Sequence, residues 1–386
     1  MRFLHTSDWH VGKPLRGQSR MDEFAAALDE VCRIVADETI DCVLVSGDLY
    51  EHKLATPEAD KLVFETLARI ASSNIAIVAI PGNHDSGIRW EALHPLLSPL
   101  GIRVVPKVVP PDEGSVVAVP SRNGSDSALV ACVPFVPERY YGSARSLFEG
   151  SEKWAQEYQQ GMGDLLDAMA RVFRSETVNV LMAHLYVTAA ALGGGELERT
   201  VSFEYAVPPG RLPATAHYVA LGHVHRPQQI PSAAPARYAG SLLQLDFGEI
   251  EQEKSVVIVE ASPGKPARVR TVPIRAGRRL VDVAGTLNEL RAKAATLGDA
   301  WVRATVRTNG PVPGIADEIR AIIPNAVHVT SDYPRARDEE DAATGLMTLR
   351  PRDQFASFYR WKHGSEPSPE VLAAFEEVYL AGEGEA

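Results

Sequence analysis

The sequence predicts an α/β fold with two packed sheets, and two patterns lead to this prediction. Helical patterns with one apolar face alternate with short apolar runs rich in β-branched residues, as in a sheet that is covered by helices. Several of these runs end in glycine or histidine beside an acidic or amide residue, and α/β sheets bind ligands at the carboxyl ends of their strands. A chain of 386 residues is long enough for two or three folding units.

The amino-terminal part of the chain predicts three strands in β-α-β succession, joined by two helices. The segment FLHTSDWHVGK begins as a strand and ends in Asp8 and His10. Residues 21–39 show an apolar stripe at helical spacing and lead into the strand DCVLVSGDLY. Residues 57–72 predict a helix opened by Pro57, and IAIVAIPGNHD is the next strand. Each strand therefore delivers polar residues to its carboxyl end.

The middle of the chain predicts the strands of the second sheet. Residues 103–150 are rich in valine, proline and glycine and predict short strands and loops, whereas residues 151–175 predict a helix. Strand-like runs follow, and the first two carry histidine at or just after their ends. These runs are VNVLMAH, HYVALGHVHRPQ, SVVIVEA and ARVRTVPI.

The pattern changes after these strands, and we expect three parts in the chain. Residues 1–276 form the first and largest. Residues 277–336 predict a small α/β domain with a helix at 284–297, the strand AWVRATVRT, a helix at 314–323 and the strand AVHVTSDYP. Residues 350–386 predict a helical tail with aromatic side chains in two segments, RDQFASFYRWKHG and SPEVLAAFEEVYL.

Composition and charge argue against several classes of protein. With 45% hydrophobic and 23% charged residues, the chain has the composition of an ordinary globular protein. No apolar run reaches the roughly 20 residues of a membrane helix, and no secretory leader is recognised, so we expect a cytoplasmic protein without membrane contact. Three cysteines without CxxC spacing argue against disulfides and zinc-thiolate sites. The net charge of −11 means that any role on nucleic acid needs metal ions, a local basic patch or a partner.

Five predicted strand ends each deliver candidate metal ligands. Oxygen and imidazole ligands without thiolate favour Mn²⁺, Fe or Zn²⁺. Two such ions roughly 3.5–4 Å apart can clamp the attacking and leaving oxygens of a phosphoryl ester, and Asp48 is the candidate bridging carboxylate. We expect Gly47, Gly82 and Gly222 to allow the sharp turns that aim these side chains at one point. The candidate residues are Asp8, His10, Asp48, Asn83, His84, His184, His223 and His225.

The order Asp-x-His, Gly-Asp, Gly-Asn-His-Asp, His, Gly-His-x-His resembles the calcineurin-like metallophosphoesterase superfamily. Within it, the surrounding sequence is similar to that of bacterial DNA-repair exonuclease subunits over roughly residues 1–275. Beyond this region the resemblance rests only on the order of helices and strands. In this order, the small α/β part is similar to the family's capping domain, and the tail is similar to the helical segment that docks on a coiled-coil ATPase. The sequence segments that carry the similarity to these subunits are HTSDWHVGKPLRG, GDLYE, GNHDS, YVALGHVHRPQ, RYAGSLLQLDFGE and EKSVVIVE.

The resemblance implies a fold, two metal ions and a set of site residues. The fold is the metallophosphoesterase sandwich of two sheets flanked by helices, and the ions are two divalent cations, Mn²⁺ foremost. His84 is implied to stay off the ions and to stabilise the phosphate charge or protonate the departing sugar oxygen, with Asp85 orienting it. The first ion is implied to bind Asp8, His10, Asp48 and His225, and the second to bind Asp48, Asn83, His184 and His223.

A few positions close to the motifs are candidate phosphate contacts. In archaeal and eukaryotic members of the family that this chain resembles, a histidine lies three residues after the bridging aspartate. In this chain Glu51 occupies that position, and His52 follows it. His52 is either a phosphate contact or a solvated loop residue. Lys13, Arg16 and Arg20 follow the first motif and either hold a DNA phosphate or form a solvated face.

The main functional interpretation is a Mn²⁺-dependent DNA exonuclease and endonuclease that works with an SMC-like ATPase. The resemblance implies 3′→5′ degradation of double-stranded ends, cleavage of single strands and hairpins, and a homodimer, for which residues 57–72 and 87–101 are candidates. An alternative is a stand-alone phosphodiesterase on nucleotides or other small esters, because the motifs select phosphoryl chemistry and not the leaving group. A third interpretation is an inactive scaffold that binds the ATPase and DNA ends, although burying a full set of polar ligands for no purpose argues against it.

Overall fold

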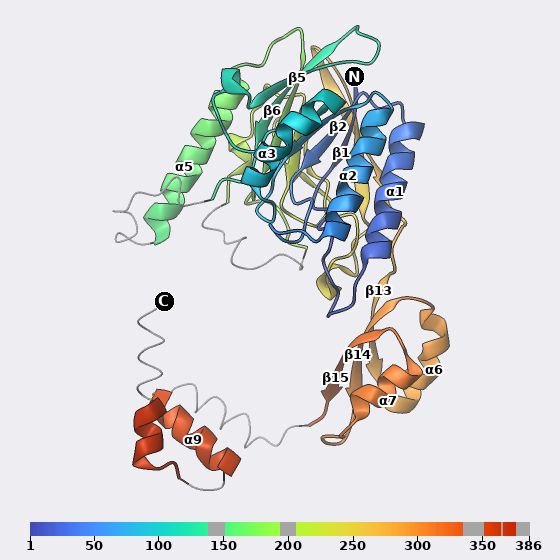
Figure 1. Ribbon diagram of the computed structural model, residues 1–386, viewed down its shortest axis with the longest axis vertical. Coiled ribbons are helices and arrows are strands. Elements are labelled where there is room, and N and C mark those ends of the chain that lie inside the picture. The colour runs from blue at the N-terminus through green and yellow to red at the C-terminus, as the bar shows by residue number, and fades with distance from the viewer. Residues whose placement is uncertain (138–150, 194–205, 335–350, 364–365, 376–386) are drawn as a thin grey trace.

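The computed structural model describes residues 1–137, 151–193, 206–334, 351–363 and 366–375, and it confirms the predicted α/β sandwich (Figure 1). Over the described part of the chain, the first sheet has six strands in the order β12, β11, β1, β2, β3, β4. The runs SVVIVEA and ARVRTVPI form β11 and β12, so our expectation that they belong to the second sheet was wrong, because β11 pairs with β1. The strands from β1 to β4 are parallel, so their carboxyl ends lie at one edge of the sheet. Their bounds are β1 Arg2–Thr6, β2 Cys42–Ser46, β3 Ala76–Ile80, β4 Ile102–Val104, β11 Ser255–Ser262 and β12 Lys265–Pro273.

The second sheet also has six strands among the described residues, in the order β5, β6, β7, β8, β10, β9. Its central strands β6, β7, β8 and β10 pair in parallel, while β5 and β9 are antiparallel to their neighbours. The residue range 103–150, expected to hold short strands, contributes β4, β5 and β6. The bounds are β5 Val116–Pro120, β6 Ser127–Val133, β7 Val178–His184, β8 Tyr218–Gly222, β9 Gln228–Ile230 and β10 Ala236–Tyr238.

Three apolar layers hold the sandwich together. Between the sheets, Phe3, Leu44 and Ile80 of the first sheet pack against Val180 and Met182 of the second. The helices α1, α2 and α3 cover the outer face of the first sheet, and α5 covers the second on the opposite side (Figure 1). All five residues of β2 are buried, as expected for a parallel strand covered on both faces. The bounds are α1 Met21–Asp37, α2 Pro57–Ser72, α3 Gly87–Leu97 and α5 Ser151–Ala170.

Residues 280–332 form a small α/β unit with its own core. Its sheet has the order β13, β14, β15, all parallel, and α6 and α7 pack on it. The helix expected from residue 284 begins only at Leu287, because Thr286 caps it and forms a capping box with Glu289, while the residues before it form β13, which we did not predict. The bounds are β13 Leu280–Gly285, α6 Leu287–Leu297, β14 Trp301–Arg307, α7 Ile315–Ile322 and β15 Ala326–Asp332.

A buried contact fastens this small unit to α1. The indole Nε1 of Trp301 donates a hydrogen bond of 2.8 Å to Glu23, whose carboxylate also accepts two hydrogen bonds from Arg20. Arg20 is buried, so our expectation of a solvated or DNA-contacting side chain at this position was wrong. An apolar cluster completes the contact, and its buried members are Leu15, Phe247, Leu280 and Trp301.

The tail contains two short helices in its described part. The helix α9 runs from Pro351 to His363, and a second helix covers residues 369–375. The rings of Phe355 and Phe375 stack with their centroids 4.2 Å apart, which joins the two helices. Residues 376–386, the last part of the predicted tail, lie outside the described residues, and the three predicted domain boundaries stay predictions.

Three further features complete the description of the fold. No helix of the described residues is long and apolar enough to cross a membrane. Cys32, Cys42 and Cys132 are buried free thiols. Single turns of 3₁₀ helix lie between the main elements, at η1 Ser98–Leu100, η2 Pro111–Glu113, η5 Pro209–Arg211 and η6 Phe247–Glu249.

Candidate metal centre

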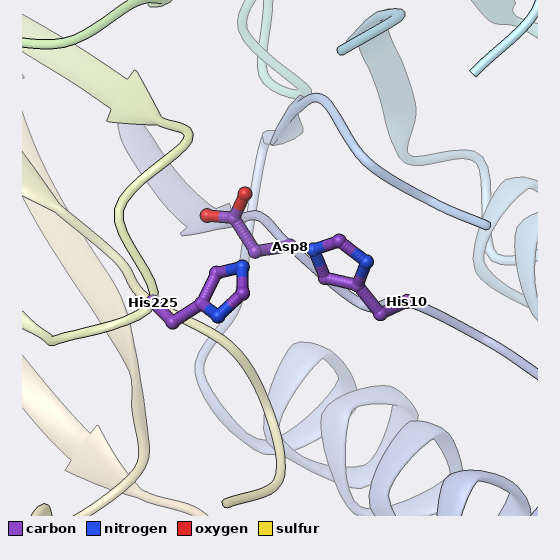
Figure 2. A group of neighbouring side chains, drawn as sticks. All are labelled: Asp8, His10 and His225. Atoms are coloured by element: carbon purple, nitrogen blue, oxygen red, sulfur yellow. The ribbon is translucent and has the colours of Figure 1, made fainter. Parts of the chain in front are cut away.

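The carboxyl ends of the strands bring predicted ligands, together with His84, into overlapping groups of side chains that could hold a metal ion. In each group, one ligand atom from each residue lies within 4.8 Å of the others. Figure 2 shows the first group, with Asp8 and His10 following β1 and His225 following β8. The groups share members, so they form one continuous centre. They are Asp8 with His10 and His225, His10 with Asp48 and His84, and Asp48 with His184 and His223.

Asp48 lies between the ligands that come from the two sheets. Its Oδ2 is 3.6 Å from Nε2 of His10 and 3.3 Å from Nε2 of His184. Its Oδ1 accepts a hydrogen bond of 2.8 Å from the backbone amide of His84. The side chain is buried. This geometry suits a carboxylate that bridges two ions, one on the His10 side and one on the His184 side.

Asn83 joins the histidines on the second side. Its Oδ1 lies 3.0 Å from Nε2 of His184 and 2.9 Å from Nδ1 of His223. The other ring nitrogen of His184 donates to the backbone carbonyl of Ser46 at 2.8 Å, which leaves Nε2 directed at the centre. The backbone amide of His223 donates to Asp8 at 3.0 Å and so ties the two sides together.

The backbone at the centre adopts a conformation that is uncommon for residues with side chains. Asp8, His10 and Asp48 have φ angles of 50°, 48° and 53°, and His223 has a φ of 101°. Non-glycine residues rarely enter this left-handed region, and such residues cluster at functional sites. The turn after each strand therefore aims its ligand at the centre at some conformational cost.

Of the glycines at the strand ends, only Gly47 has the role that we expected, a sharp turn of the backbone. Gly47 has a φ of +97°, in agreement with a sharp turn. Gly82 and Gly222 have no positive φ, so their role is to leave space. A Cβ at Gly82 would lie 2.2 Å from Oδ1 of Asp48, and one at Gly222 would lie 1.9 Å from the carbonyl oxygen of Ser46. Only a residue without a side chain allows these close approaches.

The expected partnership between His84 and Asp85 is wrong. The carboxylate of Asp85 accepts hydrogen bonds from the backbone amides of Gly82, Leu49 and Tyr50, so it joins the two loops that carry Asp48 and His84. Burial, followed by the nearby charge of Asp48, raises the pKa of Asp85 to about 6. His84 is instead oriented by its own Nδ1, which donates to the backbone carbonyl of Glu51 at 2.7 Å.

Two glutamates that we did not assign to the site contact its histidines. The Nδ1 of His10 lies 2.8 Å from Oε2 of Glu51, and the Nδ1 of His225 lies 3.1 Å from Oε1 of Glu249. Glu51 ends the matching segment GDLYE and takes the place of a histidine found in relatives, but neither observation connected it to His10. Glu249 lies within the matching segment RYAGSLLQLDFGE, but its spacing from His225 gave no sign that the two side chains meet.

The candidate phosphate contacts lie in different environments. His52 is exposed beside the centre. The Nζ of Lys13 is 2.9 Å from Glu51, and the guanidinium of Arg16 is 3.3 Å from Asp246. Both basic side chains therefore have acidic partners within the chain, and a phosphate contact by Lys13, Arg16 or His52 stays a prediction.

The donor set fits divalent metal ions. The Nε2 of His10 is buried and has no hydrogen-bond partner among the described residues, although a buried ring nitrogen ordinarily has one. A metal ion beside Asp48 would supply the missing partner. Burial lowers the pKa of His10, which keeps the imidazole neutral as metal binding requires. The residues that fit the predicted ions are those that we expected from the sequence, and their roles as ligands stay a prediction.

Comparisons with known proteins find similar chains and domains. Residues 1–227 match the family described as Calcineurin-like phosphoesterase, and residues 276–362 match that described as Type 5 capsule protein repressor C-terminal domain. Three relatives are each named as the SbcD component of the nuclease SbcCD. The Bacillus subtilis relative is 32% identical, over 98% of this chain and 97% of its own. The Rhodobacter capsulatus relative is 31% identical over 71% of this chain and 69% of its own. The Escherichia coli relative is 26% identical over 83% of this chain and 82% of its own.

Substituting Gly82→Ala is expected to abolish high-affinity metal binding while the fold persists. The new Cβ would collide with Asp48 and with the ring of His184. We expect Mn²⁺ affinity, measured by calorimetric titration, to fall by about tenfold or more, as for other changes that disturb metal-ligand orientation. Gly210→Ala is the matched control, because a Cβ there meets nothing within 4 Å. Unchanged affinity in Gly82→Ala would contradict the geometry of the centre.

Metal binding is expected to strengthen as pH rises toward 9. Burial alone would lower the pKa of His184, but the Asp48 carboxylate raises it to about 9. Below that pH the metal-free imidazole holds a proton that a bound ion must displace. We expect about one proton to be released per protein at pH 7.5, measured by titrating Mn²⁺ in buffers with different enthalpies of ionisation. Binding without proton release, and with an affinity that does not change with pH, would show that His184 is not a ligand.

Proposed function

Because this chain belongs to the calcineurin-like phosphoesterase superfamily and, within it, to the SbcD family, we propose that it is a metal-dependent DNA nuclease that acts as the nuclease subunit of an SbcC–SbcD complex. The observation that carries the proposal is the position of Asp48 between imidazoles delivered by two sheets. The proposed reactions are 3′→5′ hydrolysis of double-stranded ends and cleavage of single strands and hairpins, as the resemblance implies. With DNA as the substrate, the protein would act in the cytoplasm.

The proposed cofactor is a pair of divalent ions, most simply Mn²⁺. Hard oxygen and imidazole donors without thiolate suit this ion. When bound, such ions stabilise the charge of the phosphate and make a water molecule more acidic. The proposed ligands of the first ion are Asp8, His10, Asp48 and His225, and those of the second are Asp48, Asn83, His184 and His223.

His84 is the proposed proton donor to the departing sugar oxygen. Its Nδ1 carries a hydrogen, because the carbonyl of Glu51 can only accept. The ring is therefore held in one orientation and its Nε2 is the atom left for substrate. The side chain is only half-buried and its ring centroid lies 4.7 Å from that of His10, so it borders the ions and is open to solvent. A protonated Nε2 there would donate to the leaving oxygen or to a phosphate oxygen.

The proposed partner is an SbcC-type coiled-coil ATPase, and the tail is the proposed docking segment. The stacked rings of Phe355 and Phe375 join its two described helices, while Phe358 is half exposed on α9. Short helices that display aromatic residues suit an apolar groove on another protein. The partner would also supply positive charge for DNA binding, which this chain with a net charge of −11 lacks overall.

The proposed oligomer is a homodimer formed through α3 and its neighbours. Ile88 and Leu96 of α3 are 83% and 69% exposed, and Leu100, in the η1 turn directly after α3, is exposed as well. A second copy of the chain would cover such an apolar patch symmetrically. Tyr50, two residues after Asp48, stacks against Trp90 of α3 with ring centroids 6.0 Å apart. The dimer contact would therefore lie next to the loop that carries the proposed bridging ligand.

Hydrolysis of DNA with Mn²⁺ is the experiment that tests the proposed function. End-labelled linear duplex and hairpin DNA are incubated with the protein, alone and with SbcC and ATP, beside bis-p-nitrophenyl phosphate as a minimal diester. We expect cleavage of all three. Cleavage of the small diester alone, even with SbcC and ATP, would favour a small-molecule phosphodiesterase, and no hydrolysis of any substrate would favour an inactive scaffold.

His84→Ala is expected to lower the rate of DNA hydrolysis by about 10²- to 10⁴-fold, the range typical of a lost general acid. The number of Mn²⁺ ions bound should stay the same, because His84 is not a proposed ligand. His328→Ala, on β15 of the small unit, is the control for replacing a histidine. A normal rate in His84→Ala would remove this residue from the mechanism.

Leu96→Asp is expected to convert the dimer into a monomer, because a carboxylate would be buried without a partner at the interface. Light scattering after size-exclusion chromatography measures the mass of the full chain. Val312→Asp is the matched control, since Val312 is a partly exposed apolar residue of the small unit. A monomeric wild type, or a Leu96→Asp variant that stays dimeric, would rule out this interface.

A further inference from the structure

We propose that two glutamates outside the ligand set, Glu51 and Glu249, are positioning residues that preorganise one of the two metal sites. That site would bind its ion first and more tightly than the other. The inference rests on the proposed function, because it assumes that the centre binds two ions. It goes further by distinguishing the two sites and by assigning a role to two residues outside the set of proposed ligands.

The first step is that both histidines of one site are held in the same way. His10 and His225 each direct Nδ1 at a glutamate carboxylate, with distances of 2.8 Å to Glu51 and 3.1 Å to Glu249. A carboxylate accepts, so both imidazoles carry their hydrogen on Nδ1 and keep the Nε2 lone pair for an ion. The Nε2 of His10 indeed has no hydrogen-bond partner among the described residues. The two rings meet edge to face with centroids 4.7 Å apart.

The second step is that each glutamate is itself fixed by a lysine. The Nζ of Lys13 is 2.9 Å from Oε1 of Glu51. The Nζ of Lys254 is 2.7 Å from Oε2 of Glu249 and also donates to the backbone carbonyl of His225 at 2.9 Å. Lys254 therefore holds both the glutamate and the loop that carries the ligand. Each glutamate has one oxygen for a histidine and the other for a lysine.

The lysines also explain how these carboxylates stay charged beside the ligands. Glu249 is fully buried and Lys254 nearly so, and an unpaired charge in such a place would be strongly unfavourable. The ammonium of Lys254, 2.7 Å from Oε2 of Glu249, supplies the opposite charge for this buried carboxylate. Lys13, 2.9 Å from Oε1 of Glu51, does the same at the less buried pair.

The third step is that His184, a histidine of the other site, has a neutral oxygen and not a carboxylate behind its ring. Its Nδ1 donates to the backbone carbonyl of Ser46. The Nδ1 of His223 lies 2.9 Å from Oδ1 of Asn83, a proposed ligand of the same ion, so this nitrogen faces the ligands and not an outer partner. A carboxylate behind a metal-binding imidazole fixes its orientation more strongly than a neutral oxygen does. The rings of His10 and His225 are therefore held more firmly before an ion binds than the ring of His184.

The turn that carries Glu249 is anchored as well. Glu249 ends η6, in which Asp246 caps the amide of Gly248. Phe247 packs in the apolar cluster with Leu280 and Trp301 of the small α/β unit. The Oε2 of Glu249 also accepts from the backbone amide of Leu245 at 2.9 Å. The carboxylate is therefore part of a rigid turn and not a mobile side chain that happens to lie near His225.

Titration of the metal-free, full-length protein with Mn²⁺ tests the proposal without any activity measurement. Calorimetry and the loss of the free Mn²⁺ signal in electron paramagnetic resonance both report the two binding steps. We expect two affinities in the wild type. Glu249→Gln should weaken the tighter step by about 10- to 100-fold, the usual effect of removing an outer partner of a metal ligand, and leave the weaker step nearly unchanged. Glu253→Gln, an exposed glutamate of the same segment, is the matched control.

Two more variants keep the result interpretable if Glu249→Gln is unstable. Glu249→Gln with Lys254→Met removes both charges of the buried pair and should restore thermal stability but not the tight step. Glu51→Gln, at the less buried pair, should weaken the same step. Recovery of tight binding in the double variant would show a purely structural role and overturn the proposal, as would wild-type affinity in both single glutamine variants. If the wild type bound no Mn²⁺, the proposed function would fail as well.

Discussion

The buried carboxylate of Asp48 is the constraint on which the rest of this structure depends. A buried charge is strongly unfavourable unless other groups compensate it. Here the compensation comes from imidazoles on opposite sheets, His10 at 3.6 Å and His184 at 3.3 Å, and from a backbone amide. Burial alone would raise the pKa of Asp48, but His184 and His10 hold it well below the usual range. The sandwich must therefore bring the carboxyl ends of β1, β2 and β7 to one place.

Outward from Asp48, acidic and imidazole groups alternate. His10 lies between Asp48 and Glu51, and Glu51 in turn meets Lys13. A similar sequence runs through Glu249 and Lys254 behind His225. Each member fixes the hydrogen-bonding state of the next, so the ligand atoms are oriented before an ion arrives. The left-handed backbone at the ligands and the close approaches at Gly82 and Gly222 are local costs that this packed arrangement supports.

The sequence predicted the features that depend on local pattern. The helices and the buried strands followed from periodicity, and the ligands could be found because each lies at or shortly after the end of a strand. Other features depend on contacts between distant residues. The strand β13 is short and leads directly into a capped helix. We therefore did not predict the strand and expected the helix to begin at residue 284. Arg20 looked solvent-exposed until the structure placed it against Glu23 under Trp301.

In the candidate site, as in the fold, features set by neighbouring residues were predictable and contacts between residues far apart in the sequence were not. Asp85 follows His84 directly, and that proximity suggested a contact, but the turn sends the carboxylate to the amides of Leu49 and Tyr50. Glu51 and His10 are 41 residues apart, and Glu249 and His225 are 24 apart. No periodicity connects residues in loops at such separations. The ligands were therefore predictable, whereas the groups that hold them were not.

Anomalous X-ray scattering from crystals of the protein grown with Mn²⁺ would locate the ions relative to Asp48. If Asp48 is the bridging carboxylate, two peaks are expected roughly 3.5–4 Å apart on its two sides, one near His10 and His225 and the other near His184 and His223. A single peak, or ions that do not share Asp48, would show that this carboxylate does not bridge a metal pair.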